Sequence, residues 1–310
     1  MSRPSIAVAP ILLPPLQEAI EAAGGEVVEP PEADALVWID PRDPAGLVAV
    51  LEESDPRWVQ LPFAGIESFV EAGIVGPGRV WTCTKGIYGP ATAEHALALM
   101  LALSRRLHEH VRAESWREGW ASLGQPEQRL KDSEVVIVGT GGIGRALTGM
   151  LAPLEARVVG VNRSGRPLEG AERTVPVTEL HDVLGTADYV VLAASSTPET
   201  KALIARRELE LMNPTAWLVN VARGALVDTD ALVDALRSNE IAGAGLDVTE
   251  PEPLPTGHPL WDLDNVIVTP HVANTADMAV PELMLMVRRN VEHFAKSEPL
   301  EGLVDVSLGY

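Results

Sequence analysis

The sequence predicts an α/β protein whose parallel sheets are doubly wound, with helices on both faces. Short apolar runs alternate with segments of helical periodicity in two successive series along the chain. Such alternation is what βαβ units produce, because the strands of a parallel sheet are buried on both faces. The 310 residues are about twice the length of an ordinary domain. We therefore expect two domains.

The first series gives the strands and the helix of one domain. Predicted strands cover residues 6–9, 35–39, 58–61 and 79–83, with a helix over 16–23. Cys83, the one cysteine, ends the last of these strands and is interpreted as a buried structural residue rather than a catalytic thiol. A long apolar helix is predicted over residues 91–110, where it could join two domains.

The second series begins after a looser stretch, residues 112–128, which we take as a first boundary region. Its predicted strands cover residues 135–138, 158–162, 188–194, 217–222, 242–248 and 265–270. A last long helix is predicted over residues 281–296.

Charge and composition exclude several classes of protein. The 44 acidic and 24 basic side chains leave a formal charge of -20, which repels phosphate backbones, so nucleic acid is not an expected partner. One cysteine cannot form an intramolecular disulfide, and the sequence therefore predicts a reducing, cytoplasmic location. No apolar run approaches the roughly 20 residues that cross a bilayer, and no metal-ligand motif occurs. Neither a membrane span nor a metal site is expected.

A glycine-rich turn follows the strand at residues 135–138. Gly139, Gly141 and Gly144 have the spacing G-x-G-x-x-G, with a strand before them and a helix after them. In dinucleotide-binding proteins the three glycines allow a tight turn, close approach of a pyrophosphate, and close packing of helix on strand. The following helix N-terminus offers N–H groups to the anion. We predict a dinucleotide site here.

The end of the next strand indicates which dinucleotide binds. Asn162 stands eighteen residues past Gly144, where NAD-selective sites carry an acid for the ribose 2′-hydroxyl. No acid is present, whereas Arg163, Ser164 and Arg166 offer donors that suit a 2′-phosphate. NADP(H) is therefore the predicted preference, with NAD(H) left open as the alternative in which these are solvated loop charges.

Polar side chains follow three later strands of the second series. Arg223, Asp247 and His271 each stand just past an apolar run, and Glu252 lies in the Pro-rich loop beyond Asp247. The carboxyl ends of parallel strands line the ligand crevice of an open sheet. Next to a nicotinamide site, these residues suggest interconversion of a 2-oxo and a 2-hydroxy acid. Arg223 would bind the substrate carboxylate, His271 would exchange a proton, and Glu252 would orient His271 and favour its protonated form.

These residues lie in blocks that resemble the D-isomer-specific 2-hydroxyacid dehydrogenase family over nearly the whole chain. Residues 138–144 look like its cofactor turn, 218–253 like its long signature block, 265–275 like its histidine segment, and 94–106 like its interdomain helix. The family fold implies two Rossmann-like or flavodoxin-like domains, the dinucleotide domain being inserted into the substrate domain. We expect residues 1–92 with 282–310 to form the substrate domain and residues 93–281 the dinucleotide domain.

The resemblance also implies roles for individual residues. Arg223, Glu252 and His271 would be catalytic, and Phe63, Ala64 and Gly65 would join Arg223 in binding the substrate. The expected cofactor-binding residues are Gly139, Gly141, Gly142, Ile143, Gly144, Asn162, Arg163, Ser164, Val221, Ala222 and Asp247. Members of the family are generally dimers, so a homodimer is expected. His95, in the long apolar helix, is interpreted as a core or interface histidine.

The predicted activity is NAD(P)-dependent reduction of a small 2-oxo acid, such as glyoxylate or hydroxypyruvate, to its D-2-hydroxy acid. Residues 1–92 contain few cations, of which only Lys85 is expected near a cleft, whereas a phosphorylated substrate needs several. An NAD-dependent 3-phosphoglycerate dehydrogenase is the alternative enzyme. A dinucleotide-sensing, corepressor-like binding protein is the alternative from a different class.

Overall fold

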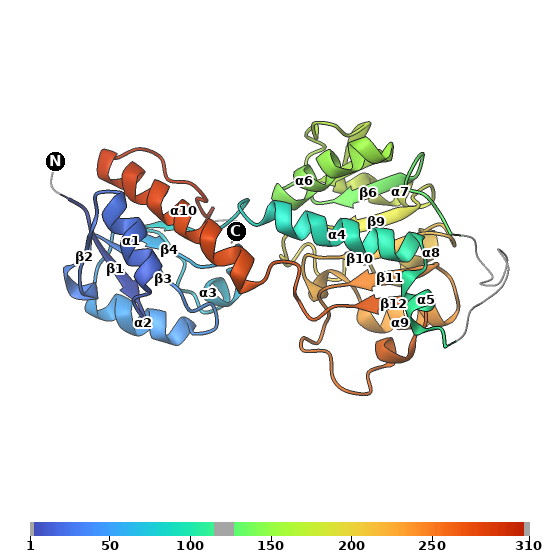
Figure 1. Ribbon diagram of the computed structural model, residues 1–310, viewed down its shortest axis with the longest axis horizontal. Helices are drawn as coiled ribbons and strands as arrows, with labels where there is room; N and C mark the ends of the chain where they lie inside the picture. The colour runs from blue at the N-terminus through green and yellow to red at the C-terminus, as the bar shows by residue number, and fades with distance from the viewer. Residues whose placement is uncertain (1–2, 115–126, 307–310) are drawn as a thin grey trace. The chain divides into compact units, whose positions relative to one another are not determined.

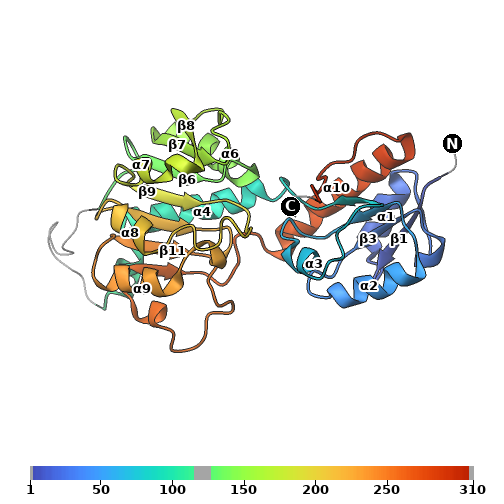
Figure 2. The ribbon, with the colours of Figure 1, turned by 180° about the vertical axis from the view of Figure 1, so that it is seen from behind.

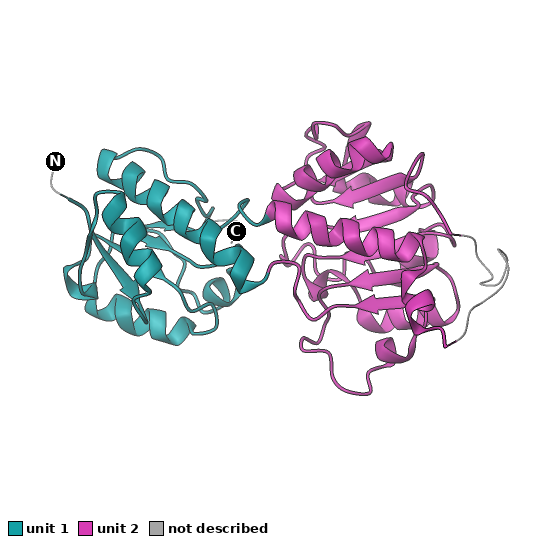
Figure 3. Cartoon of the chain, in the orientation of Figure 1, with its two compact units in different colours: residues 1–88, 275–310 teal, residues 89–274 magenta. Residues whose placement is uncertain are grey.

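A computed structural model describes residues 3–114 and 127–306. The chain divides into two compact units, residues 1–88 with 275–310 (unit 1) and residues 89–274 (unit 2; Figure 3). Each unit holds one sheet in which all the paired strands are parallel, so the α/β, Rossmann-like class is confirmed. The units divide where helices α4 (Gly89–Ser104) and α10 (Ala276–Lys296) begin. The limits expected from the sequence are 92/93 and 281/282.

Unit 1 contains a five-stranded sheet in the order β2-β1-β3-β4-β5. Its strands are β1 (Ser5–Ala9), β2 (Glu26–Val27), β3 (Ala35–Trp38), β4 (Trp58–Gln60) and β5 (Val80–Thr82). Helices α1 (Pro14–Ala22) and α10 pack on one face, and α2 (Pro44–Glu53) and α3 (Glu67–Glu71) on the other (Figure 1). Cys83 is fully buried beside β5, as expected, and burial raises the pKa of its thiol.

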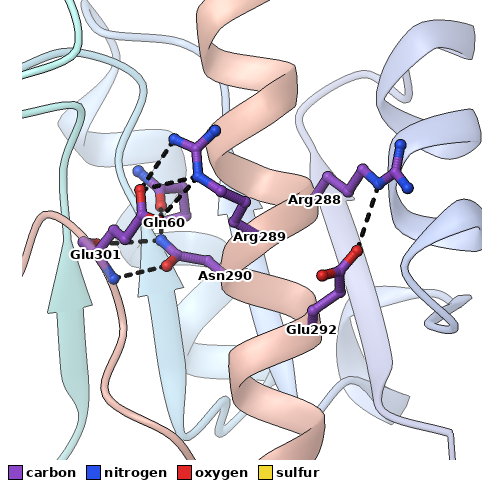
Figure 4. A network of polar contacts seen from close by, with 6 residues as sticks. All are labelled: Gln60, Arg288, Arg289, Asn290, Glu292 and Glu301. Atoms are coloured by element: carbon purple, nitrogen blue, oxygen red, sulfur yellow. Dashed lines mark hydrogen bonds and ion pairs between the residues drawn. The ribbon is translucent and has the colours of Figure 1, made fainter.

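A buried polar network in unit 1 joins its last helix to the sheet (Figure 4). Asn290 of α10 donates to Gln60 Oε1 at 3.1 Å and pairs with both backbone groups of Glu301, at 2.7 and 3.1 Å. Thr82 also donates to Gln60 Oε1, at 2.8 Å. Arg289 holds the Glu301 carboxylate through its Nε and Nη2. The network ties the chain that follows α10 to strand β4.

Unit 2 contains a seven-stranded sheet in the order β12-β11-β10-β9-β6-β7-β8. Its strands are β6 (Glu134–Val138), β7 (Arg157–Asn162), β8 (Arg173–Pro176), β9 (Tyr189–Leu192), β10 (Trp217–Asn220), β11 (Gly243–Leu246) and β12 (Val266–Val268). Helices α4 and α6 (Gly142–Leu151) cover one face. Helices α7 (Leu180–Leu184), α8 (Arg206–Leu211) and α9 (Thr229–Arg237) cover the other (Figure 2). Strand β6 pairs with both β7 and β9, so the winding reverses at its carboxyl end.

Two expected helices differ from the structure, and two of its short strands were not expected. The predicted helix over residues 91–110 is two helices, α4 and α5 (Leu107–Arg112), because Arg106 takes a left-handed conformation with φ of 50°. Helix α10 starts at Ala276, with Pro281 inside it. Proline favours a helix start, and this preference explains the late predicted boundary. The short strands β2 and β8 were not predicted, because Glu26, Arg173 and the final Pro176 obscure their apolar pattern.

Short 3₁₀ turns complete the fold at Pro30–Glu32, Ala152–Leu154, Val177–Glu179, Gly224–Leu226 and Pro259–Asp262. In residues 3–114 and 127–306, every helix is too short or too polar to cross a bilayer. Over the same ranges, no three His, Cys, Asp or Glu side chains gather closely enough to hold a metal ion.

Candidate active site

The glycine turn lies at the carboxyl end of β6, where the winding of the unit 2 sheet reverses. A Cβ on Gly139, whose φ is +105°, would lie 2.4 Å from the carbonyl carbon of Ala193, and one on Gly144 would lie 2.2 Å from the carbonyl oxygen of Gly139. Neither position has room for a side chain. A Cβ on Gly141 would meet nothing within 4 Å, so this backbone is open to a ligand.

The turn fits the pyrophosphate of a dinucleotide. Gly141 is the N-cap of α6 and has no side chain with which to cap the first N–H groups of the helix. Those groups have no intrahelical partners and carry the positive end of the helix dipole. Ile143, also in the first turn, is half-buried. Gly89, the first residue of α4, packs so closely here that its Cβ would lie 2.6 Å from the carbonyl carbon of Gly142.

Asn162 organises the loop at the end of β7. Its Oδ1 accepts from the backbone N–H groups of Ser164 and Arg166, both at 3.1 Å, and its Nδ2 donates to Thr140 Oγ1 at 2.9 Å and to the Arg166 carbonyl at 2.8 Å. The amide therefore links the glycine turn to the 162–166 loop. Arg163, Ser164 and Arg166 are exposed along this loop.

Three expected site residues follow adjacent strands. Arg223 comes after β10, Asp247 after β11 and His271 after β12, and these strands pair in that order. All three residues therefore lie at the carboxyl edge that also carries the glycine turn. Val221 and Ala222, just past β10, are buried. Arg223 is half-buried, and its Nη1 donates to the Ala222 carbonyl at 2.7 Å.

His271 and Glu252 form a close pair. The distance from His271 Nδ1 to Glu252 Oε1 is 2.6 Å, with side-chain exposures of 50% and 41%. An ion pair this exposed adds only about 0–1 kcal/mol to folding stability. Its main effect is orientation: Nδ1 faces the carboxylate, and Nε2 is the ring nitrogen left to exchange a proton with a ligand.

The backbone of His271 is left-handed, with φ of 53°, a conformation that costs a residue with a side chain about 1–2 kcal/mol. Hydrogen bonds to Asp247 hold it. The N–H of His271 donates to the Asp247 carbonyl at 2.8 Å. The next two N–H groups, of Val272 and Ala273, donate to the Asp247 carboxylate at 2.9 and 3.0 Å.

Asp247 is 1% exposed, and its carboxylate is ionised. Burial alone would raise the pKa, but hydrogen bonds from His95, Thr269 and the backbone of Val272 and Ala273 outweigh it and lower the pKa from 3.8 to about 2. Thr269 Oγ1 donates to Asp247 Oδ1 at 2.6 Å. His95 Nε2, on α4, lies 3.0 Å from Thr269 Oγ1 and 3.3 Å from Asp247 Oδ1.

His95 and Thr269 were not among the expected site residues. The apolar periodicity of α4 concealed His95, because it favours the interpretation as a core or interface histidine. For Thr269, one feature of the sequence could have indicated a place in the site. It stands two residues before His271, so both residues fall at the carboxyl end of β12.

The predicted substrate loop of unit 1 follows β4. Phe63 and Ala64 are exposed and Gly65 is half-buried. Tyr88 packs on Phe63, with ring centroids 6.2 Å apart, and its hydroxyl donates to the Pro62 carbonyl at 3.2 Å. Lys85 is exposed, and its Nζ donates to the Leu303 carbonyl at 3.4 Å.

A family model described as "D-isomer specific 2-hydroxyacid dehydrogenase, NAD binding domain" matches residues 97–273. The chain belongs to the D-isomer-specific 2-hydroxyacid dehydrogenase family. The match covers the glycine turn and the three strand ends just described, and it confirms the resemblance seen in the sequence. As a member of this family, the protein is an NAD(P)-dependent oxidoreductase.

The similarity of this dehydrogenase to curated relatives extends beyond the residues that the family model matches. An uncharacterized protein of Corynebacterium melassecola is 41% identical over 258 residues, which are 82% of this chain and 84% of that protein. Glyoxylate reductase of Thermococcus litoralis is 36% identical over 230 residues, or 72% of this chain and 69% of the relative. The human glyoxylate reductase/hydroxypyruvate reductase is 35% identical over 221 residues, or 70% and 67%.

Solved structures of the same family match the whole dehydrogenase. One from Xanthobacter autotrophicus Py2, in complex with NADPH and MES, is 28% identical, covers all of both chains and has a TM-score of 0.85. Another, from Aeromonas salmonicida, is 28% identical over 98% of this chain and all of that chain, with a TM-score of 0.82.

Proposed function

We propose that this dehydrogenase reduces a small, unphosphorylated 2-oxo acid, of the glyoxylate or hydroxypyruvate kind, to the D-2-hydroxy acid, with NADP(H) as the preferred cofactor. The observation that carries the proposal is the His271–Glu252 pair, 2.6 Å apart and exposed, on the sheet edge that also bears the glycine turn. A proton donor beside a dinucleotide site is what reduction of a carbonyl requires.

The residues divide the chemistry between them. A bound nicotinamide would supply the hydride to C2 of the 2-oxo acid. His271 Nε2 gives its proton to the carbonyl oxygen, and the Glu252 carboxylate balances the charge on the ring and fixes its orientation. In oxidation His271 accepts the proton instead. Arg223 holds the substrate carboxylate and draws electron density from the carbonyl oxygen.

The remaining expected residues keep the roles that the family resemblance implies. The loop with Phe63, Ala64 and Gly65 contributes backbone donors to the substrate carboxylate. The proposed cofactor contacts are Gly139, Gly141, Gly142, Ile143, Gly144, Asn162, Arg163, Ser164, Val221, Ala222 and Asp247.

Preference for NADP(H) is supported by the loop after β7. The loop presents exposed Arg163 and Ser164 and has no acid at position 162. Asn162 uses its amide to shape the loop, and a guanidinium and a hydroxyl are suitable donors for a 2′-phosphate. The Xanthobacter relative was solved with NADPH, which agrees with this choice.

The test follows nicotinamide absorbance with NADPH and NADH in parallel. Glyoxylate, hydroxypyruvate, pyruvate, longer 2-oxo acids and 3-phosphohydroxypyruvate serve as substrates, and D- and L-2-hydroxy acids are tested in the reverse direction. We expect NADPH oxidation with an unphosphorylated acid and reverse turnover of the D isomer. NADH oxidation with the phosphorylated acid alone would instead identify a phosphoglycerate dehydrogenase. Dinucleotide binding without any turnover would identify a sensor protein.

A homodimer and a cytoplasmic location remain predictions.

A further inference from the structure

We propose that His95 is a positioning residue, which holds the His271 segment in its left-handed conformation through Thr269 and Asp247. This proposal rests on the function proposed above, because it concerns how the proton donor is placed. The proposal gives a side chain of α4 a role in the site, although the expected acid–base pair, His271 and Glu252, lies on other segments.

The hydrogen-bond directions determine which nitrogen of His95 carries a proton. Thr269 has one hydroxyl hydrogen, and the 2.6 Å distance to Asp247 Oδ1 commits it to the carboxylate. The Thr269 oxygen and the ionised carboxylate can then only accept from His95. Its Nε2 faces both, at 3.0 and 3.3 Å, so Nε2 must carry a hydrogen. His95 is therefore a donor in this network.

With His95, the Asp247 carboxylate has four donors: His95, Thr269 and the N–H groups of Val272 and Ala273. Four is about the number of lone-pair sites that a carboxylate offers. At 1% exposure, water has little access to replace a lost donor, and a buried carboxylate that loses one weakens or shifts its other bonds. The two backbone donors directly follow His271.

Loss of the His95 donor is therefore expected to loosen the backbone of residues 271–273. His271 is held at φ of 53° only by its surroundings. If the segment relaxes, the imidazole moves away from the substrate, while the glycine turn and the 162–166 loop keep their own hydrogen bonds. Proton transfer weakens. Dinucleotide binding changes little, because every proposed cofactor contact other than Asp247 lies outside this network.

The experiment compares His95→Phe, which removes the donor, with His95→Gln, whose amide N–H can take the place of Nε2–H. Thr269→Val and Thr269→Ser form a second removing and restoring pair, and carry the test if His95→Phe does not fold. His181→Phe is the matched control, because His181 Nε2 also meets a carboxylate, Glu208 Oε1 at 2.7 Å, and belongs to no expected site.

Three quantities are measured on each full-length variant: kcat and KM for the 2-oxo acid, NADPH affinity by fluorescence titration, and amide hydrogen exchange of the peptide spanning residues 268–275. We expect His95→Phe and Thr269→Val to lower kcat about 10- to 100-fold and to speed exchange at Val272 and Ala273. NADPH affinity should stay within about threefold. The Gln, Ser and control variants should retain kcat and slow exchange.

Unchanged kcat and exchange in His95→Phe would overturn the proposal. So would an equal loss in the Gln and Phe variants, or a parallel loss of NADPH affinity, because both indicate general damage to unit 2. If the wild type reduces no 2-oxo acid, the proposed function fails. The exchange at Val272 and Ala273 then decides the positioning proposal by itself.

Discussion

Each unit of the molecule contains a buried polar hub that joins a helix to a strand, and the two hubs differ in what they support. Asn290 in unit 1 is fully buried and binds Gln60 and the backbone of Glu301. Asp247 in unit 2 is 1% exposed and binds Thr269 and the backbone that follows His271. The first hub is neutral and stabilises the fold, whereas the second is ionised and leads to an exposed, reactive side chain.

The comparison teaches that burial and hydrogen bonding alone do not identify a functional site. Hydrogen-bond partners satisfy both hubs, as burial of polar groups requires. The difference lies at the end of each network. Around Asn290 the partners are buried or belong to the backbone, and around Asp247 the network ends at an imidazole that is 50% exposed. Stability and turnover should therefore respond separately to changes in the two units.

The largest expected effect is that of His271→Ala on turnover. Loss of the proton donor should lower kcat about 10²- to 10⁴-fold, with NADPH affinity and melting temperature near those of the wild type, because the side chain is exposed. Steady-state kinetics with the best 2-oxo acid and a thermal melt are the measurements. His181→Ala is the control and should keep its kcat. Near-normal turnover of His271→Ala would disprove the acid–base assignment.

Asn290→Leu should lower stability and leave turnover unchanged, the opposite of the result expected for His271→Ala. It leaves the N–H of Glu301 without its 2.7 Å acceptor and should lower the free energy of unfolding by about 2–3 kcal/mol. Assayed well below the melting temperature, kcat should remain that of the wild type. Urea unfolding and kinetics measure the two effects.

Glu292→Ala is the matched control on α10. Its carboxylate meets Arg288 at 3.4 Å on the surface (Figure 4), and its loss should change stability by less than about 0.5 kcal/mol. A large fall in kcat for Asn290→Leu would show that the two hubs are not independent.

Asp247 should make part of the free energy of unfolding depend on pH. Its pKa is about 2 in the folded chain against 3.8 ordinarily. A lowered carboxyl pKa contributes stability that is present above the ordinary value and disappears as pH falls through the folded value. The contribution, about 2 kcal/mol, should therefore fade between about pH 4 and pH 2. In urea unfolding, Asp247→Asn should lose less stability than the wild type over this window. Equal losses would contradict the assigned cause.

The sequence predicted the parts of the site whose chemistry is local. The glycines of the turn, and Arg223 and His271 at strand ends, follow from spacing and from the rule that parallel strands end at one edge. The fold class follows from the alternation of strands and helices. Each of these inferences needs only a short stretch of chain and the type of element around it.

The sequence could not predict the network behind His271. His95 and Thr269 stand 174 residues apart, and only the packing of α4 on the sheet brings them together. The sequence also contains no signal for the helix break at Arg106, since residues 91–110 contain no glycine or proline. Such features depend on tertiary contacts, which override local preference.

The smallest expected effect concerns Asn162, a half-buried side chain that shapes an exposed loop through its hydrogen bonds, as Asn290 shapes the chain after α10. In Asn162→Asp the side chain can still accept from Ser164 and Arg166, and it gains a charge that repels a 2′-phosphate and can accept from a ribose hydroxyl. The ratio of kcat/KM for NADPH to that for NADH should fall about tenfold, or about 1.4 kcal/mol. Asn213→Asp is the control, because Asn213 Oδ1 accepts from the Thr215 N–H at 3.0 Å in the same kind of turn. The control adds the same charge and should leave the NADPH to NADH ratio of kcat/KM unchanged. If Asn162→Asp also left this ratio unchanged, the loop after β7 would not select the cofactor.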